Sequence, residues 1–203
     1  MTALFLVRHG LTSHTGTRLT GWTPGVHLTD DGRTGVERLA SWLADVPFKA
    51  VYSSPIDRTL ETARIVAEPH GLTVRTRRGI GEVHYGKWTN RPLRSLMRTK
   101  LWGTVQRWPS AARFPDGETL REVQARAVGE VEKLAAEHPK DAICCVSHGD
   151  VIKLIAAHYL GVHIDLFQRI VIAPASVSVI SLSRETPHVL SLNSLPLAMG
   201  ARA

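Results

Sequence analysis

The chain has 203 residues, of which 43% are hydrophobic and 21% charged, and its formal net charge is +7. Its length suits one well-packed domain, and its composition is that of a globular chain rather than a disordered one. No run reaches the roughly 18 apolar residues that span a bilayer, and the first residues show neither a basic n-region nor a cleavage site. We therefore expect a cytoplasmic protein without a membrane partner, whose positive charge favours anionic partners.

The first third of the chain predicts two strands, each followed by a helix. Leu4–Val7 is an apolar run too short for a helix, and Thr29 can cap a helix that continues to about Asp45. Ala50–Tyr52 predicts a second strand. Ser54 and Pro55 then offer an N-cap and a first helical residue for the next helix.

The rest of the chain continues the alternation of helices and strands. Thr119 and Glu122 form a capping-box pattern at the start of a helix with apolar residues on one face. An almost wholly apolar helix is expected from about Asp150 to Leu160. Three further strands are expected at Ala142–Val146, Val177–Leu182 and Val189–Leu192. This order predicts a single α/β domain over residues 1–203, with three α/β/α layers and a mostly parallel central sheet.

The two cysteines, Cys144 and Cys145, are adjacent in an apolar stretch. Successive strand residues point to opposite faces of a sheet, so a disulfide between them would be strained. We expect two buried thiols. No Cys and His spacing resembles a zinc site, so no metal and no other cofactor is expected.

Charged and histidine residues follow three of the predicted strands. Arg8 and His9 end the first strand, Arg58 lies in the first helical turn after the second, and His148 and Gly149 end the third. Ligands of open α/β sheets sit at the carboxyl ends of the strands. Arginine forks match phosphate oxygens, and the N-terminus of the helix near Gly149 adds backbone N–H groups. These residues together predict a phosphate-binding pocket.

Each of these residues has a simpler interpretation when taken alone. A lone histidine is often half-buried with a satisfied hydrogen bond, Arg58 can be a helix-surface cation, and Asp150 is most simply an N-cap. The coincidence of three strand ends favours the functional interpretation.

Four motifs in this order resemble the histidine phosphatase superfamily, the phosphoglycerate-mutase-like proteins, over nearly the full length. They are Leu6 to Thr12 (LVRHGLT), Ser53 to Ala63 (SSPIDRTLETA), Glu82 to Trp88 (EVHYGKW) and Ser147 to Gly149 (SHG). The resemblance implies that His9 is the phosphorylated nucleophile and Glu82 the general acid. It further implies that the phosphate is held by Arg8, Arg58, His148, Thr15 and Gly149, and that Thr20 and Gly21 contact substrate.

The sequence departs from the family pattern at three positions. Leu11 replaces a frequent acidic residue, His14 replaces a frequent tryptophan, and Asp150 places a negative charge next to the second His-Gly. These differences bear on the substrate more than on the chemistry.

The chemistry explains why these residue types are needed. A neutral imidazole is available near pH 7, so His9 can attack phosphorus while the arginines stabilise the transferring group without a metal. The other ring nitrogen of His9 is expected to donate to a backbone carbonyl. Glu82 would protonate the leaving alkoxide and then activate water, for which burial should raise its pKa. The predicted function is a metal-independent phosphatase of small phosphate monoesters.

Between residues 84 and 117 the sequence forms a basic, aromatic insertion. It has no acidic residue from His84 to Pro115, but seven Lys and Arg residues and three Trp residues. Some of its members, of which His84, Lys87 and Arg91 are candidates, can form a lid that binds a second anionic group of the substrate. The alternatives are a solvated basic face with tryptophans packed on the core, and a homodimer contact.

Two rival functions remain at this stage. A phosphomutase would use the same pocket, and Glu82–Gly86 with Thr20–Trp22 resembles the mutase branch, although Ser147–Asp150 does not. A nucleic-acid-binding module could use the basic insertion and its tryptophans, but no recognised motif supports it. We expect a small phosphorylated metabolite as partner rather than nucleic acid. Its identity and the oligomeric state are not specified by the sequence.

Overall fold

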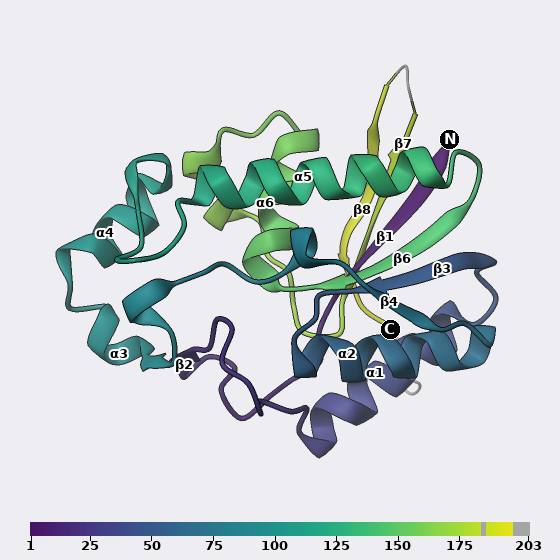
Figure 1. The fold of residues 1–203 in the computed structure, drawn as a ribbon, viewed down its shortest axis with the longest axis horizontal. Helices are drawn as coiled ribbons and strands as arrows, with labels where there is room; N and C mark the ends of the chain where they lie inside the picture. The colour runs from purple at the N-terminus through teal and green to yellow at the C-terminus, as the bar shows by residue number, and fades with distance from the viewer. Residues whose placement is uncertain (184–185, 197–203) are drawn as a thin grey trace, which may run out of the picture.

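The computed structural model of the protein describes residues 1–183 and 186–196 (Figure 1). The strands of its main sheet are β1 (Thr2–Arg8), β3 (Phe48–Ser53), β4 (Val74–Thr76), β6 (Ala142–Ser147), β7 (Val177–Leu182) and β8 (His188–Ser194). The longer helices are α1 (Asp30–Leu43), α2 (Asp57–Ala67), α5 (Leu120–Glu137) and α6 (Gly149–Tyr159). Smaller elements are β2 (Arg18–Leu19), β5 (Arg91–Pro92), α3 (Leu93–Leu96), α4 (Lys100–Arg107) and five 3₁₀ turns, η1 (Glu68–His70), η2 (Arg78–Ile80), η3 (Gly86–Trp88), η4 (Pro109–Ala111) and η5 (Ile164–Arg169).

The main sheet has the strand order β4-β3-β6-β1-β7-β8. Strands β4, β3, β6 and β1 pair in parallel, whereas β7 runs antiparallel to β1 and β8 antiparallel to β7. Helices α1 and α2 cover one face of this sheet and α5 and α6 the other (Figure 1). The predicted α/β class with a mostly parallel central sheet is thus confirmed, and the carboxyl ends of β1, β3 and β6 meet at one edge.

Strand β6 contributes to the hydrophobic cores on both faces of the sheet. Ile143 and Cys145 belong to the core under α5 and α6, while Cys144 and Val146 belong to the core under α1 and α2. This alternation follows from the two-residue period of a strand, and it explains why β6 reads as one continuous apolar run. Both cysteines are buried and free, as predicted.

Two helices begin with the N-cap residues that the sequence predicts. The side chain of Thr29 accepts a hydrogen bond from the backbone N–H of Gly32 at 3.0 Å, and α1 ends at Leu43. Thr119 and Glu122 form the complete capping box of α5. Such local hydrogen bonds are readable from sequence because both partners lie within one turn.

The predicted start of α2 is wrong, because Ile56 and not Ser54 is its N-cap residue. Helix α6 begins at Gly149, close to the expected start at about Asp150, but its N-cap residue is His148 and not Asp150. The Ser54 hydroxyl lies 2.8 Å from the Nε2 atom of His148, and its backbone N–H donates to the carbonyl of Val146. These tertiary contacts hold Ser54 in an extended conformation beside β6, so the helix begins two residues beyond the proline.

The segment from residue 84 to 117 packs onto the core mainly through its apolar residues. Trp88, Leu96 and Phe114 are buried in the core on the α5 and α6 side, and Trp102 packs against them. Its cations are all exposed, namely Lys87, Arg91, Arg94, Arg98, Lys100, Arg107 and Arg113. This arrangement favours the solvated basic face over a lid that presents its cations to a ligand.

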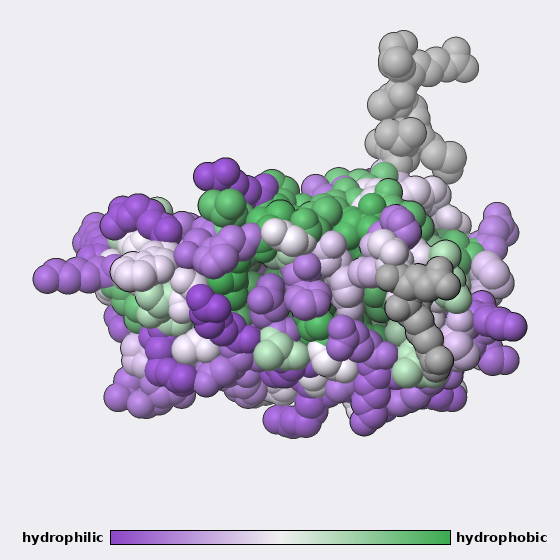
Figure 2. Space-filling view, turned by 90° about the horizontal axis from the view of Figure 1, so that it is seen from above, coloured by the Kyte–Doolittle hydropathy of each residue, from purple (hydrophilic) through white to green (hydrophobic). Residues whose placement is uncertain are grey.

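The face of the molecule along α5 carries a band of apolar surface among polar residues (Figure 2). Within residues 1–183 and 186–196, no helix has the length and apolar character required to pass through a bilayer.

Candidate active site

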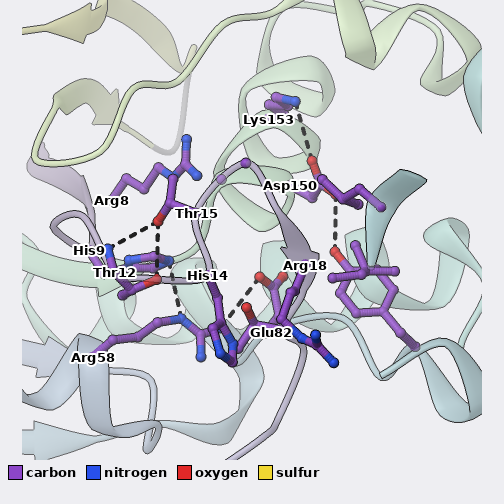
Figure 3. A pocket seen from close by; sticks show the side chains of 16 residues that line it. Arg8, His9, Thr12, His14, Thr15, Arg18, Arg58, Glu82, Asp150 and Lys153 are labelled. Carbon is purple, nitrogen blue, oxygen red and sulfur yellow. Dashed lines mark hydrogen bonds and ion pairs between the residues drawn. The ribbon is translucent and has the colours of Figure 1, made fainter. Parts of the chain in front are cut away.

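The edge of the sheet where β1, β3 and β6 end holds a cluster of buried polar side chains (Figure 3). His9 follows β1, Arg58 lies in the first turn of α2, and His148 follows β6. The Arg58 guanidinium lies 3.2 Å from Nε2 of His9 and 3.1 Å from Nδ1 of His148. The centroids of the two imidazole rings are 5.4 Å apart. The structure thus brings together the residues that the three strand ends supply.

His9 is held as a neutral imidazole in one tautomer. Its Nδ1 lies 2.7 Å from the carbonyl oxygen of Gly10, which can only accept, so Nδ1 carries the proton. Nε2 carries no proton, and its one lone pair accepts a hydrogen bond from Nε of Arg58. Burial, with the charges of Arg58 and Arg8 nearby, holds the pKa of His9 well below its usual value. The ring is therefore an unprotonated nucleophile at neutral pH.

Two guanidinium groups, those of the buried Arg58 and the half-buried Arg8, supply the positive charge of the cluster. Arg58 is only 1% exposed, and Arg8 donates from NH1 to the carbonyl oxygen of Ile172 at 2.6 Å. Burial lowers the pKa of both groups, but a guanidinium remains protonated in proteins. Among the described residues, Nε of Arg8 and NH1 of Arg58 are buried without a hydrogen-bond partner. Unused donors of this kind are suited to the oxygens of a phosphate.

Glu82 approaches the cluster from the loop that follows η2. One carboxylate oxygen accepts from the backbone N–H of Val83 at 3.0 Å. The other lies 3.7 Å from Arg58 and 3.6 Å from Nδ1 of His148. Burial raises the pKa of Glu82 to about 7; Arg58 opposes this rise, whereas Asp150 adds to it. The carboxyl can therefore give and take a proton near neutral pH.

His148 is fully buried and is also neutral in the resting site. Arg58 can only donate, so Nδ1 of His148 accepts and Nε2–H donates to the Ser54 hydroxyl at 2.8 Å. Burial and the charge of Arg58 keep its pKa well below the usual value. A neutral His148 adds no positive charge before a ligand enters, so this charge comes from the two arginines.

Ser54 contacts the ring of His148, and the sequence did not indicate this contact because the two residues lie 94 positions apart. We expect Ser54→Ala to lower kcat about tenfold with little change in KM, since a buried N–H loses its acceptor and the ring loses its orientation. Steady-state kinetics on an alkyl phosphate would measure this. Ser53→Ala is the matched control, because the Ser53 hydroxyl donates to the Ser54 carbonyl and does not touch His148. A thermal shift in Ser54→Ala without a change in kcat would leave Ser54 with a structural role only.

Gly149 begins α6 and lets Arg8 pack against the helix N-terminus. A Cβ at this position would lie 3.2 Å from the guanidinium carbon of Arg8. Since His148 makes no side-chain cap bond, the first N–H groups of α6 are available to a ligand.

A cavity of about 190 Å³ is lined by Arg8, His9, Arg58, Glu82 and Gly149, whereas His148 is not among its lining residues. Thr15 and Thr20 line it as well, and Gly21 lies behind it, accepting from Arg58 through its carbonyl at 3.0 Å. The structure does not bring His84, Lys87 and Arg91 to this cavity. His84 stacks on Trp22 at 4.4 Å, and Lys87 pairs with Asp116 at the surface. The expectation that these three residues contact substrate therefore gains no geometric support.

Several residues of the cavity wall were not selected as site residues from the sequence. The outer wall includes His14, Arg18, Leu19, Tyr85, Leu93, Asp150 and Lys153. No spacing marks these residues, because they come from the loop after β1, from β2, from the residue before η3, from α3 and from α6, at different distances along the chain. Among the described residues, no three His, Cys, Asp or Glu side chains gather where they could hold a metal ion.

Comparison with known proteins agrees with this geometry. The family model of the histidine phosphatase superfamily (branch 1) matches residues 4–195. Phosphoserine phosphatase 1 of Hydrogenobacter thermophilus is 29% identical over 95% of this chain and 92% of its own length. The probable phosphoglycerate mutase GpmB of Yersinia pestis is 26% identical over 94% and 89%.

A solved structure extends the likeness to three dimensions. Bacillus stearothermophilus YhfR superposes with a TM-score of 0.88 at 27% identity, covering 96% of this chain and 98% of that one. The same conclusion therefore follows from the fold, from the buried cluster of histidine and arginine side chains, and from the family match. The chain belongs to the histidine phosphatase superfamily, branch 1.

Proposed function

We propose that this protein hydrolyses small phosphate monoesters, without a metal, through a phosphohistidine formed on His9. The observation that carries this proposal is the state of the His9 ring. Its Nε2 lone pair is free of a proton, while its Nδ1–H is fixed on the Gly10 carbonyl. The buried Arg58 and the half-buried Arg8 place positive charge near the ring. A nucleophile prepared in this way next to unused cationic donors suits an in-line attack on phosphorus.

The first step forms a nitrogen–phosphorus bond and breaks the ester bond. As phosphate oxygens enter, Arg58 releases the lone pair of His9 and donates to the oxygens instead, together with Arg8. Nε2 then attacks phosphorus, and the departing alkoxide takes the proton of Glu82. The positive charge of the arginines matches the charge that spreads over the equatorial oxygens.

The second step returns the site to its starting state. Glu82, now a carboxylate, removes a proton from water, and the water oxygen attacks phosphorus while the nitrogen–phosphorus bond breaks. Inorganic phosphate leaves, and Glu82 is again protonated. A carboxyl whose pKa is about 7 is suited to both halves of this cycle.

The substrate class is small phosphorylated metabolites. The relatives named above include a phosphoserine phosphatase, and the structurally similar proteins include a putative α-ribazole-5'-P phosphatase of Escherichia coli. A cavity of about 190 Å³ is in keeping with small esters. The exposed cations of residues 84–117 are the ones that a nucleic acid could contact. They do not line this cavity, so hydrolysis of a small ester at His9 does not depend on them.

A phosphomutase acting at the same site is the second candidate, favoured by the likeness to a probable phosphoglycerate mutase. One experiment separates the two functions. A panel of phosphate esters that includes 3-phosphoglycerate is incubated with the protein and a chelator, and free phosphate is measured. In parallel, formation of 2-phosphoglycerate is followed after addition of a bisphosphoglycerate primer. We expect free phosphate and no 2-phosphoglycerate; the opposite result would establish the mutase.

A further inference from the structure

The outer wall of the active-site cavity carries charges of both signs on one turn of α6. Asp150 and Lys153 both line the cavity, and Nζ of Lys153 lies 3.3 Å from Oδ1 of Asp150 (Figure 3). Their side chains are 28% and 18% exposed, so both groups are largely withdrawn from solvent. The mechanism proposed above assigns neither of them a chemical step.

Three further contacts fix these two charges in place. The Tyr85 hydroxyl donates to Oδ2 of Asp150 at 3.1 Å. Lys153 donates to Oε1 of Gln168, in η5, at 3.1 Å, and its ammonium lies 5.8 Å from the ring of Phe167. Contacts from Tyr85, just before η3, and from η5 therefore reduce the rotamer freedom that each side chain would lose on binding a ligand.

A carboxylate at this position is unfavourable for a substrate that carries only negative charge. Asp150 lines the same cavity as Arg8, His9 and Gly149, so its negative charge opposes the approach of an anion. A substrate that offers a positive group to Asp150 converts this repulsion into an attraction. A carboxylate has about four lone-pair sites, and within residues 1–183 and 186–196 two of them are used, by Tyr85 and Lys153.

The positively charged residues of the same wall also have hydrogen-bond donors to spare. Lys153 has three N–H donors, of which Asp150 and Gln168 use two. Arg18, which also lines the cavity, is held by the side chain and the carbonyl of Asn90. A carboxylate of the substrate can therefore be bound close to the group that binds its ammonium.

We propose that Asp150 and Lys153 form a zwitterion site that selects phosphate esters whose alcohol part bears both an ammonium and a carboxylate group. Asp150 accepts from the ammonium and Lys153 donates to the carboxylate, so the pair exchanges its mutual contact for the two charges of the ligand. The substrate class is then that of O-phosphorylated amino acids. This inference rests on the proposed phosphatase function and names its specificity residues.

Four probe esters test the two charges separately. Phosphoserine carries both groups, phosphoethanolamine only the ammonium, 3-phosphoglycerate only the carboxylate, and glycerol 3-phosphate neither. We expect phosphoserine to have the highest kcat/KM of the four in the wild-type protein. The variants are Asp150→Asn and Lys153→Met, which keep the approximate shape of each side chain and remove its charge.

Each variant is expected to change a different ratio of kcat/KM values. Asp150→Asn lowers the ratio of phosphoserine to 3-phosphoglycerate about 10- to 100-fold, the range of a charge-assisted hydrogen bond. Lys153→Met lowers the ratio of phosphoserine to phosphoethanolamine by a similar factor. The exposed pair of Lys87 and Asp116, 2.9 Å apart, provides the matched controls Lys87→Met and Asp116→Asn, which leave both ratios unchanged.

The outcomes separate this inference from the function on which it rests. If the wild-type protein cleaves p-nitrophenyl phosphate through His9 but both ratios stay within twofold in the two variants, the zwitterion site is refuted and the phosphatase stands. If it cleaves neither p-nitrophenyl phosphate nor any of the four probes, the proposed function itself is refuted. A uniform loss on all probes would show that the pair only supports the fold of α6.

Discussion

Replacement of His9 with alanine is expected to lower phosphate release by at least about 10⁴-fold, because the variant lacks the atom that bonds to phosphorus. Arg8, Arg58 and Glu82 remain in His9→Ala, so substrate binding should be largely retained. Phosphate release from p-nitrophenyl phosphate measures the loss. Acid-labile phosphate on the protein, sought after rapid quenching in alkali, should be found in the wild type and not in the variant.

A variant of a second histidine is the control for any general effect of removing an imidazole. His188 is exposed on β8 and does not line the cavity, so His188→Ala should retain the wild-type rate and the phosphoprotein. Turnover in His9→Ala within tenfold of the wild type would show that phosphate does not pass through this ring.

Glu82→Gln is expected to have an effect that depends on the leaving group. An alkoxide needs a proton as the ester bond breaks, whereas p-nitrophenolate is stable without one. The variant should therefore lose about 10²- to 10⁴-fold on an alkyl phosphate in the bond-breaking step, and clearly less on p-nitrophenyl phosphate. Pre-steady-state formation of the phosphoprotein isolates this step from the later attack of water. An equal loss on both esters would remove Glu82 from the role of acid.

The pH profile gives a second measure of the same group. The pKa of Glu82 is raised to about 7, so the protonated acid is present below this pH and disappears as the pH rises through it. In the wild type, the bond-breaking rate with an alkyl phosphate should fall above pH 7, with a slope that approaches tenfold per pH unit. In Glu82→Gln this limb should vanish. A wild-type rate that stays flat from pH 5 to 9 would contradict the assignment.

Local signals explain what the sequence could predict of the fold. The cap at Thr29 and the capping box at Thr119 involve residues within one helical turn, so their patterns are readable from the sequence. Strands β1 and β6 are buried on both faces and therefore appear as continuous apolar runs. Strand β4 has only three residues, none of them fully buried, and it was missed for that reason.

The candidate site, too, contains residues that the sequence could predict and residues that it could not. Arg8, His9, Arg58 and His148 follow strands or open helices, so the topology of a parallel sheet brings them together. The role of Ser54 depends on a contact across 94 positions, and it was read as a helix cap instead. Residues 84–117 were expected to contribute cations that contact the substrate because cations are abundant there. Their abundance does not tell which way the side chains point. The structure places them in solvent and gives the wall to residues such as Arg18 and Lys153.

The bridging position of Arg58 has a consequence for the working enzyme. Before a ligand enters, its charge is shared between two uncharged rings. Any tetrahedral oxyanion satisfies that cation about equally well, whether it is an intact ester or the liberated product. Inorganic phosphate should therefore act as a general competitive inhibitor, and turnover in a phosphate-rich environment would be limited by how often the product vacates the site. An ester can outcompete the product only through contacts made by its alcohol part.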